Sequence, residues 1–393
     1  MTFQYGDEWL AESTQLPVSM SLPKQSKPFR LRECRPFFGG LLPEEGQLKA
    51  VAGRLGISET NDFKLLEALG GDVAGALSIW PEGEHPPARD ATAQPKPLDE
   101  EKVSELLDAL PKRPLLAGEG GLRLSLAGAQ PKLPVVLVDG QIALPAPGQP
   151  TTHILKPAIG RFDAIIENEA MMMRLAAAIE LSVAQVESRR AGGKSYLLVT
   201  RYDRQFEATG EVRRLHQEDF CQALGLPPDQ KYQFENGPSF KTSFELVRRA
   251  AAQPAVEVLK LLDAAIFNVI IGNADAHGKN FSLLYQGHGV TLAPLYDLIC
   301  TVAYEDLATR FAMKIGKSRT IDEIDGNAWS TFATDVEFTP GYVVKRVGTL
   351  SEAVQRSIPQ VVARLHEEGR NREALDRYAA VVTARATRIA KTA

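Results

Sequence analysis

The chain has 393 residues, of which 44% are hydrophobic and 24% are charged, and its formal net charge is −4. This length exceeds what one small core needs and predicts two or three domains. The composition is that of an ordinary globular protein, and so mild an acidity gives no global attraction to nucleic acid, although a local basic patch stays open. No apolar run is long enough to span a bilayer, and residues 1–13 are too polar and acidic for a signal peptide. We therefore expect no membrane partner.

The cysteines set an expectation about the compartment. Cys34, Cys221 and Cys300 lie far apart and are odd in number, which argues against a disulfide framework. They predict a reducing, cytoplasmic compartment, in which each cysteine serves as a small core residue.

Residues 1–83 are expected to form a compact module. Alternating polarity predicts a strand at 17–23, and helical spacing predicts two helices, at 44–58 and 61–71. A strand-like run follows at 72–80. We find no cluster of titratable residues in this module that demands chemistry.

The next residues connect this module to the rest of the chain. The run 84–98 is rich in proline and charge and predicts a linker. Residues 99–110 then form an amphipathic helix whose first turn is acidic, as the helix dipole favours. We expect one lobe to span 99–204.

Residues 121–138 predict a strand, a tight turn and a second strand. The turn, Ala127 to Gln130, is small enough for its backbone amides to approach a phosphate, and Lys132 would add a positive charge. No Walker A sequence is present, so an ordinary hairpin turn remains the alternative. Ser125 precedes the turn and is by itself an ordinary strand serine.

Further strands and a helix complete this lobe. A strand at 153–157 carries Lys156, where a kinase-like lobe places its phosphate-pairing lysine. Glu169, in a helix at 165–180, would pair with Lys156 or be a solvated carboxylate. Strands are also expected at 183–190 and 195–204, and Thr200, Arg201 and Tyr202 would form a hinge whose backbone meets an adenine edge.

Residues 205–393 are expected to be mostly helical. The predicted helices include 216–225 with an acidic first turn, 243–253, 255–272, and amphipathic segments from about 341 to the end. Two short strands, 281–285 and 290–294, interrupt them as a hairpin.

The most informative stretch runs from Asn273 to Asp297. Asp275 and Asn280 have the spacing D-x-x-x-x-N, and the hairpin would return Asp297 to the side of Asn280. Phosphoryl transfer needs a carboxylate to accept the attacking hydroxyl's proton and oxygen ligands for magnesium. Asp275 would do the first, and Asn280 with Asp297 the second. The alternative is a polar turn that ends a helix before an ordinary hairpin.

The ordered set of motifs resembles HipA-type serine/threonine kinases, the toxins of bacterial type II toxin–antitoxin pairs. The resemblance covers nearly the whole chain, and its segments occur in family order: DEWLAES, PVSMSLP, PFFGGLLPEEG, LEALGGDVAGAL, SLAGAQPK, THILKP, VTRYDR, QEDFCQALG, GNADAHGKNFS and LAPLYD. It implies an α+β fold of two protein-kinase-like lobes, with a small N-terminal α/β subdomain and an α-helical C-lobe. It also implies ATP and Mg²⁺ as cofactors.

The resemblance assigns roles to individual residues. Asp275 would be the catalytic base, Asn280 and Asp297 the metal ligands, and Ser125 the site of an inactivating autophosphorylation. Glu169 and Gln217 are possible supporting residues. The remaining nucleotide-binding assignments are Ala127, Gly128, Ala129, Gln130, Pro131, Lys132, Lys156, Thr200, Arg201, Tyr202, His277, Gly278, Lys279, Asn280 and Tyr296.

The resemblance also implies partners and a biological role. The family's substrates are aminoacyl-tRNA synthetases, whose phosphorylation arrests translation and growth. The usual partner is a HipB-like helix-turn-helix antitoxin, through which operator DNA is bound. Family members normally begin with about two more strands than this sequence, which puts the antitoxin contact in question. Lys314, Lys317 and Arg319, in an expected loop, would contact DNA phosphates or be a solvated basic loop.

Three other functions stay open. The same lobes would suit a small-molecule or lipid kinase, in which label passes to a metabolite or lipid. A catalytically silent corepressor would bind operator DNA with the antitoxin but no nucleotide. A metal hydrolase would use Asp275 and His277, although the spacing supplies no third ligand.

Overall fold

The computed structural model describes residues 1–86, 95–287 and 289–392. These form two compact units: the first comprises 1–160, 187–228 and 284–288, and the second 161–186, 229–283 and 289–393. Most of the linker expected at 84–98, namely 87–94, lies outside the described residues.

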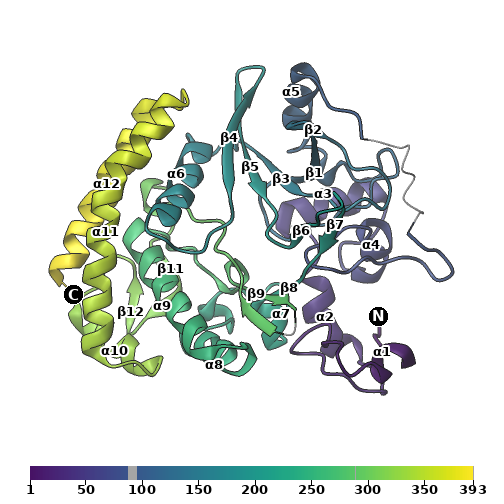
Figure 1. The fold of residues 1–393 in the computed structure, drawn as a ribbon, viewed down its shortest axis with the longest axis horizontal. Helices are drawn as coiled ribbons and strands as arrows, with labels where there is room; N and C mark the ends of the chain where they lie inside the picture. Colours follow the sequence, from purple (N-terminus) through teal and green to yellow (C-terminus); the bar gives the residue numbers. More distant parts are fainter. Residues whose placement is uncertain (87–94, 288, 393) are drawn as a thin grey trace. The chain divides into compact units, whose positions relative to one another are not determined.

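The first unit begins with short helices around their own apolar core (Figure 1). That core includes Phe29, Phe37, Leu65 and Val73. The helices predicted at 44–58 and 61–71 are confirmed, and they end where glycines stop them. The helices of this region are α1 (Asp7–Ala11), α2 (Leu31–Gly39), α3 (Glu45–Leu55), α4 (Asp62–Leu69) and α5 (Glu100–Ala109).

Two strands predicted in this region are wrong. Residues 17–23 form a tight turn closed by one bridge between Ser19 and Leu22, and 72–80 make one bridge, from Asp72 to Leu124. Side chains replace neighbouring strands as partners: the Val18 and Met20 amides donate to Tyr5 and Glu218. Alternating polarity could not reveal that no strand lies alongside, and it also misjudged burial, because Ser19 is fully buried while Val18 and Met20 are half-buried.

A five-stranded sheet follows, in the order β2-β1-β3-β5-β4. The strand expectations for 153–157, 183–190 and 195–204 are confirmed within a few residues, as is the second strand of 121–138, whereas 121–126 is not a strand. In the register, Lys156 on β3 lies opposite Leu197 on β5. The strands are β1 (Leu133–Val138), β2 (Gln141–Ala143), β3 (His153–Pro157), β4 (Val186–Ala191) and β5 (Lys194–Thr200).

The end of the first unit contains a hairpin and a short strand–helix segment. The hairpin pairs β6 (Arg204–Phe206) with β7 (Val212–Arg214). The helix predicted over 216–225 is only partly right, because its first residues form strand β8 (His216–Asp219) and only α7 (Phe220–Leu224) is helical. Asp219 caps α7 by accepting from the Gln222 amide, so the acidic residue stops the strand and starts the helix.

Glu218, on β8, is a buried carboxylate that ties this segment to the N-terminal residues. It accepts hydrogen bonds from the Ser19 hydroxyl at 2.5 Å, from the Met20 amide at 3.0 Å, and from Tyr285. Burial raises the pKa of Glu218 to about 7, although the hydrogen bonds from Ser19 and Tyr285 act to lower it. Protonation of Glu218 therefore occurs near neutral pH in the folded protein.

We predict that, relative to Glu218→Gln, the wild type loses folding stability between pH 5.5 and pH 8. The folded protein holds the Glu218 proton more tightly than the unfolded chain, so this contribution is present at low pH and is lost as pH rises through about 7. The whole effect is at most about 3 kcal/mol. Urea unfolding at both pH values measures it, with exposed Glu82→Gln as the control. An unchanged pH dependence in Glu218→Gln would contradict the prediction.

The second unit is built mainly from helices, as expected for the C-terminal part (Figure 1). The long α11 and α12 lie side by side, and both also pack on α6 and α9. The three consecutive methionines of α6, Met171 to Met173, are buried in this packing. The helices are α6 (Ile165–Ala178), α8 (Phe240–Ala250), α9 (Pro254–Ile271), α10 (Gly326–Asp335), α11 (Pro340–Glu367) and α12 (Arg372–Thr392).

The described residues also contain the short strands β9 to β12, of which the last two form a hairpin where a loop was expected. The strands β9 (Ser282–Gln286) and β10 (Gly289–Leu292) match the predicted hairpin strands. The basic segment with Lys314, Lys317 and Arg319 is not a loop, because β11 (Arg310–Ile315) pairs with β12 (Ser318–Thr320) across a tight turn. Gly316 supplies the positive φ of that turn.

Cys34, Cys221 and Cys300 are free thiols in buried positions, as predicted. Among the helices of the described residues, none combines the length and apolarity needed to cross a bilayer.

Candidate functional site

The loop that carries Asp275 and Asn280 starts where α9 ends. Pro254 begins this largely buried helix, and Gly272 ends it in the left-handed conformation, with φ of +80°. A Cβ at Gly272 would lie 2.4 Å from Val302 Cγ2, so only glycine permits this close approach. The chain is thereby turned sharply into the loop.

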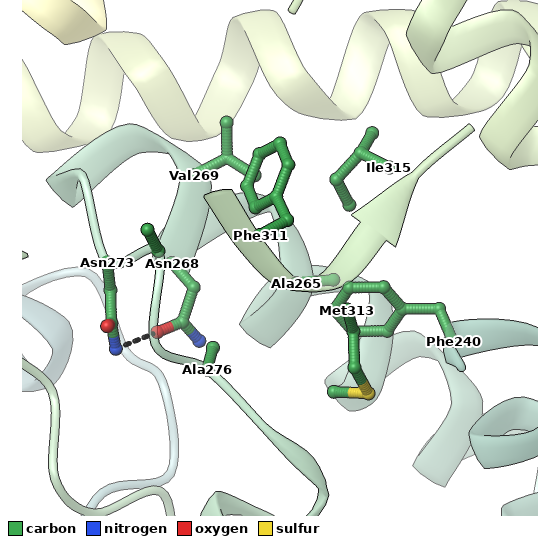
Figure 2. A pocket seen from close by; sticks show the side chains of 10 residues that line it. Phe240, Ala265, Asn268, Val269, Asn273, Ala276, Phe311, Met313 and Ile315 are labelled. Carbon is green, nitrogen blue, oxygen red and sulfur yellow. Dashed lines mark hydrogen bonds between the residues drawn. The ribbon is translucent and has the colours of Figure 1, made fainter. Parts of the chain in front are cut away.

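A chain of hydrogen bonds fixes the first residues of this loop. The Asn273 side chain donates to Asn268 Oδ1 at 2.8 Å, and its own Oδ1 accepts from the Asp275 amide at 3.1 Å. Figure 2 shows the two asparagines joined in this way. The neighbouring Ala274 amide donates to Thr301 Oγ1 at 2.9 Å. Asp275 is exposed, whereas Ala274 and Ala276 on either side are buried. The loop thus presents one carboxylate to solvent on a rigid support.

The space behind the loop is a small apolar cavity of about 10 Å³. Side chains from α9, β11 and the loop line it, including Val269, Phe311 and Met313 (Figure 2). It has room for about one water molecule. A nucleotide does not fit there, so this cavity is packing behind the site.

The segment from His277 to Asn280 forms a compact turn, the 3₁₀-helix Gly278–Asn280. The Asn280 Oδ1 atom accepts from the His277 amide at 3.1 Å, and the Gly278 amide donates to the Lys231 carbonyl at 3.2 Å. The His277 ring packs edge-on against Tyr232, with ring centroids 5.4 Å apart. These contacts hold the Asn280 carboxamide in one orientation.

Hydrogen bonds bring the Asp297 segment beside this turn. The Tyr296 hydroxyl donates to the Lys279 carbonyl at 2.8 Å and accepts from the Ser282 hydroxyl at 2.7 Å. Tyr296 and Lys279 are the immediate chain neighbours of Asp297 and Asn280. Asp297 itself has a φ of +53°, a conformation that costs an aspartate energy and often occurs at functional sites.

Two polar side chains that the sequence reasoning missed hold the chain beyond Asp297. Asn168, in α6, donates to the Cys300 carbonyl at 3.1 Å and accepts from the Cys300 amide at 2.8 Å. Thr301 Oγ1 donates to the Gly272 carbonyl at 3.0 Å while it accepts from Ala274. The sequence gives no clear signal for Asn168, because it stands between two glutamates in IIENEAMMM.

The oxygen donors on these loops fit a magnesium ion. Carboxylate and carboxamide oxygens are the ligands that Mg²⁺ prefers, and it usually takes only one or two protein carboxylates beside water and phosphate. Asn280 Oδ1 keeps a second lone pair after accepting from His277. Within 1–86, 95–287 and 289–392, no three His, Cys, Asp or Glu residues gather as a metal site. An all-protein hydrolase centre therefore gains no support here.

In the first unit, the turn from Ala127 to Lys132 curls around a lysine. The Lys132 ammonium donates to the Ala127 carbonyl at 2.8 Å, and Gly128 has a φ of +114°. That φ favours glycine, and a Cβ at Gly128 would also displace the Lys132 ammonium, whose Nζ would lie 2.4 Å away. Ala129 is exposed, and Gln130 and Pro131 are half-buried. Small residues around an ammonium group suit an anion such as phosphate.

Ser125 is fully buried beside this turn. Its hydroxyl donates to the Leu41 carbonyl at 2.7 Å, and its amide donates to the Asp72 carbonyl at 3.0 Å. The Glu44 amide also donates to the Gly128 carbonyl at 3.2 Å. The N-terminal residues therefore hold both Ser125 and the turn.

Lys156 and Glu169 belong to different units. Lys156 lies on β3 with its side chain buried, and Glu169 is buried within α6. Their pairing remains a prediction.

In the expected hinge, Thr200 to Tyr202, the Arg201 side chain makes most of the contacts. Arg201 is buried, and its guanidinium donates to Asp203, Asp72, Thr151 and the Val73 carbonyl. The Arg201 backbone amide already donates to the Thr152 carbonyl at 3.0 Å. An adenine edge would therefore have to bond to other backbone groups of Thr200 to Tyr202. Gln217 contacts the Tyr202 hydroxyl, which places it beside the hinge.

Two family models match this chain. The model of the HipA N-terminal domain matches residues 1–80, and that of the HipA-like C-terminal domain matches 124–367. The second covers more than half of the chain. The chain belongs to the HipA family.

Relatives of this HipA-family protein are named as kinases. It is 57% identical to a putative kinase, Y4mE, of Sinorhizobium fredii over 92% of this chain and 86% of the relative. It is 32% identical to the serine/threonine-protein kinase toxin HipA of Shewanella oneidensis, over 91% of this chain and 82% of that protein.

A solved structure confirms the predicted fold class. HipA of Shewanella oneidensis, in a complex with HipB and operator DNA, matches with a TM-score of 0.85 and 28% identity. The match covers 98% of this chain and 92% of that one. The α+β, HipA-like expectation and the assignment to a kinase toxin family are therefore correct.

Proposed function

We propose that this HipA-family protein is an ATP- and Mg²⁺-dependent protein serine/threonine kinase, the toxin of a toxin–antitoxin pair. The observation that supports it most is the pair of adjoining loops in which Tyr296 bonds to Lys279. That contact brings the chain neighbours of Asn280 and Asp297 together, and the first of these loops also carries exposed Asp275. Family membership makes phosphoryl transfer the chemistry to which these loops are best suited.

Each residue has a defined task in this proposal. Asp275 orients the acceptor serine hydroxyl and takes its proton. The hydrogen bond from the Asp275 backbone amide to the Asn273 side chain keeps the loop rigid. Asn280 and Asp297 hold the magnesium ion, which when bound neutralises charge on the phosphates. Lys156 and Lys132, with the amides of the turn at Gly128, bind phosphate oxygens. The backbone of Thr200 to Tyr202, His277 and Tyr296 line the nucleotide.

The finer biological assignments rest on the relatives. By analogy with the Shewanella complex, we infer a HipB-like antitoxin as partner and operator DNA bound through that complex. An aminoacyl-tRNA synthetase is the proposed protein substrate. Lys314, Lys317 and Arg319 on the β11–β12 hairpin are the candidate residues for direct contact with operator DNA phosphates. A small-molecule or lipid kinase and a silent corepressor are the competing functions.

We predict that incubation with Mg·ATP phosphorylates Ser125. Its hydroxyl is buried against the Leu41 carbonyl, so the segment must leave this packing to react, and a doubly charged phosphate would not fit back. Intact-mass and peptide mass spectrometry should find the phosphate in the wild type and not in Asp275→Asn. Label that appears in lysate metabolites or lipids instead of protein would favour the small-molecule kinase. Absence of nucleotide binding together with operator binding would favour the corepressor.

A further inference from the structure

Asp72 lies at the centre of a buried charge cluster in the first unit. Its carboxylate accepts from Arg204 at 2.9 Å, Arg214 at 3.0 Å and Arg201 at 3.3 Å. Arg201 and Arg204 also contact Asp203, so three guanidinium groups face two carboxylates. The side chains of Asp72, Asp203, Arg201 and Arg204 are less than 5% exposed, and Arg214 is 19% exposed.

The hydrogen-bond donors of the buried arginines have acceptors, and Asp72 is held in its ionised form. All five N–H donors of Arg201 have acceptors: two on Asp203, one each on Asp72 and Thr151, and the Val73 carbonyl. Burial alone would raise the pKa of Asp72, but the nearby guanidinium groups outweigh it and hold that pKa below its usual value. Such a network specifies one geometry, because any displacement leaves buried charges unpaired.

Asp72 also contacts three segments that the proposed nucleotide site uses. Its backbone carbonyl accepts from the Ser125 amide at 3.0 Å, two residues before the phosphate turn. Its carboxylate accepts from Thr151, at 2.6 Å from the hydroxyl, just before the strand that carries Lys156. Through Arg201 it reaches the hinge. Asp72 itself lies within 1–80, the part matched by the HipA N-terminal domain.

We propose that Asp72 is a positioning residue for nucleotide binding, by which the N-terminal domain aligns the phosphate turn, the Lys156 strand and the hinge. The inference rests on the proposed kinase function. It explains why 72–80 is not a strand: its backbone groups at Val73 and Gly75 bond to the side chains of Arg201, Arg204 and Asp203. In this view the N-terminal domain is part of the nucleotide site and not only a surface for partners.

The test must break the carboxylate contacts from Asp72 to Thr151 and Arg201 without leaving an extra buried charge, while the backbone bond from Ser125 to Asp72 stays in place. Asp72→Asn alone would leave three guanidinium groups facing one carboxylate, so it is combined with Arg214→Gln, which restores the original charge excess. Arg214→Gln alone is the matched control, because Arg214 contacts Asp72 but none of the three segments is held through it in the contacts above. Thr151→Val is a second, nearly isosteric variant that removes the hydroxyl between Asp72 and Arg201.

The full-length variants are titrated with Mg²⁺ and a non-hydrolysable ATP analogue by calorimetry, and their melting temperatures are recorded. We expect the double variant to bind about tenfold more weakly than Arg214→Gln. We expect Thr151→Val to bind about fivefold more weakly than wild type. The KM for ATP should rise in parallel, while kcat at saturating ATP stays within about threefold.

The outcomes separate this inference from the function on which it rests. If the double variant binds the analogue as tightly as Arg214→Gln, the positioning role is wrong and the kinase function stands. Should the double variant not fold, Thr151→Val binding as tightly as wild type has the same meaning. If kcat falls while analogue affinity holds, the role is likewise wrong. If wild type itself binds no analogue, both the kinase function and the positioning role fail.

Discussion

Asp275→Asn should lower kinase activity by a factor of about 10²–10⁴ while leaving the fold unchanged. The substitution keeps the size of the side chain but removes the group that accepts the serine proton. The Asp275 side chain is exposed. The loop is held by the hydrogen bond from the Asp275 backbone amide to the Asn273 side chain, which the variant retains. The loss should therefore appear in kcat and hardly in the melting temperature.

The measurement is transfer of labelled phosphate from ATP to protein, with the wild type, Asp275→Asn and a control variant at equal concentration. Asp335→Asn, an exposed aspartate at the end of α10, makes the same chemical change away from the loop and should keep full activity. An Asp275→Asn protein with more than a tenth of wild-type activity would show that another group accepts the proton.

The helices α9 and α5 could be predicted because their causes are local. For α9, an initial proline, an apolar run and the final Gly272 all lie within one stretch of the sequence. Asp99 likewise caps α5 by accepting from the Lys102 amide three residues later. Capping and periodicity require no knowledge of distant residues, and these elements were placed within one or two positions.

The failures have distant causes. The residues 17–23 and 72–80 bond to side chains about 130 to 200 residues away, such as Ser19 to Glu218 and Gly75 to Asp203. Alternating polarity cannot distinguish such a partner from a neighbouring strand. The HQED residues are an exception with a local cause: Asp219 serves as the cap of a helix that begins one residue later, and the residues up to it form strand β8.

The candidate site divides in the same way. The order of Asp275, Asn280 and Asp297 was visible in the sequence, because the chemistry dictates which residue types recur around a hairpin. Their supports were not visible: Asn168 contacts Cys300 across 132 positions, and Asn273 appeared only as the start of a polar turn. A role in orienting another residue leaves little trace in residue type, because any buried asparagine would serve equally.

Asp297→Asn should weaken metal binding by at least about tenfold and abolish most activity at low Mg²⁺ concentration. Asparagine is the informative replacement because Asp297 has a φ of +53°, a conformation that asparagine adopts readily and alanine does not. The variant therefore removes one negative charge while the backbone and the bond from Tyr296 to Lys279 stay in place.

Metal binding can be followed without catalysis, by the paramagnetic resonance of Mn²⁺ titrated into the protein with a non-hydrolysable ATP analogue. Asp306→Asn, an exposed aspartate nine residues further along the chain, serves as the charge-matched control. If charge at Asp297 holds the ion, excess Mg²⁺ should restore part of the lost activity in Asp297→Asn but none in Asp275→Asn. Only Asp297→Asn has weakened metal binding, which a higher Mg²⁺ concentration offsets by mass action. Equal Mn²⁺ affinity in Asp297→Asn and wild type would remove Asp297 from the metal site and leave Asn280 without its partner.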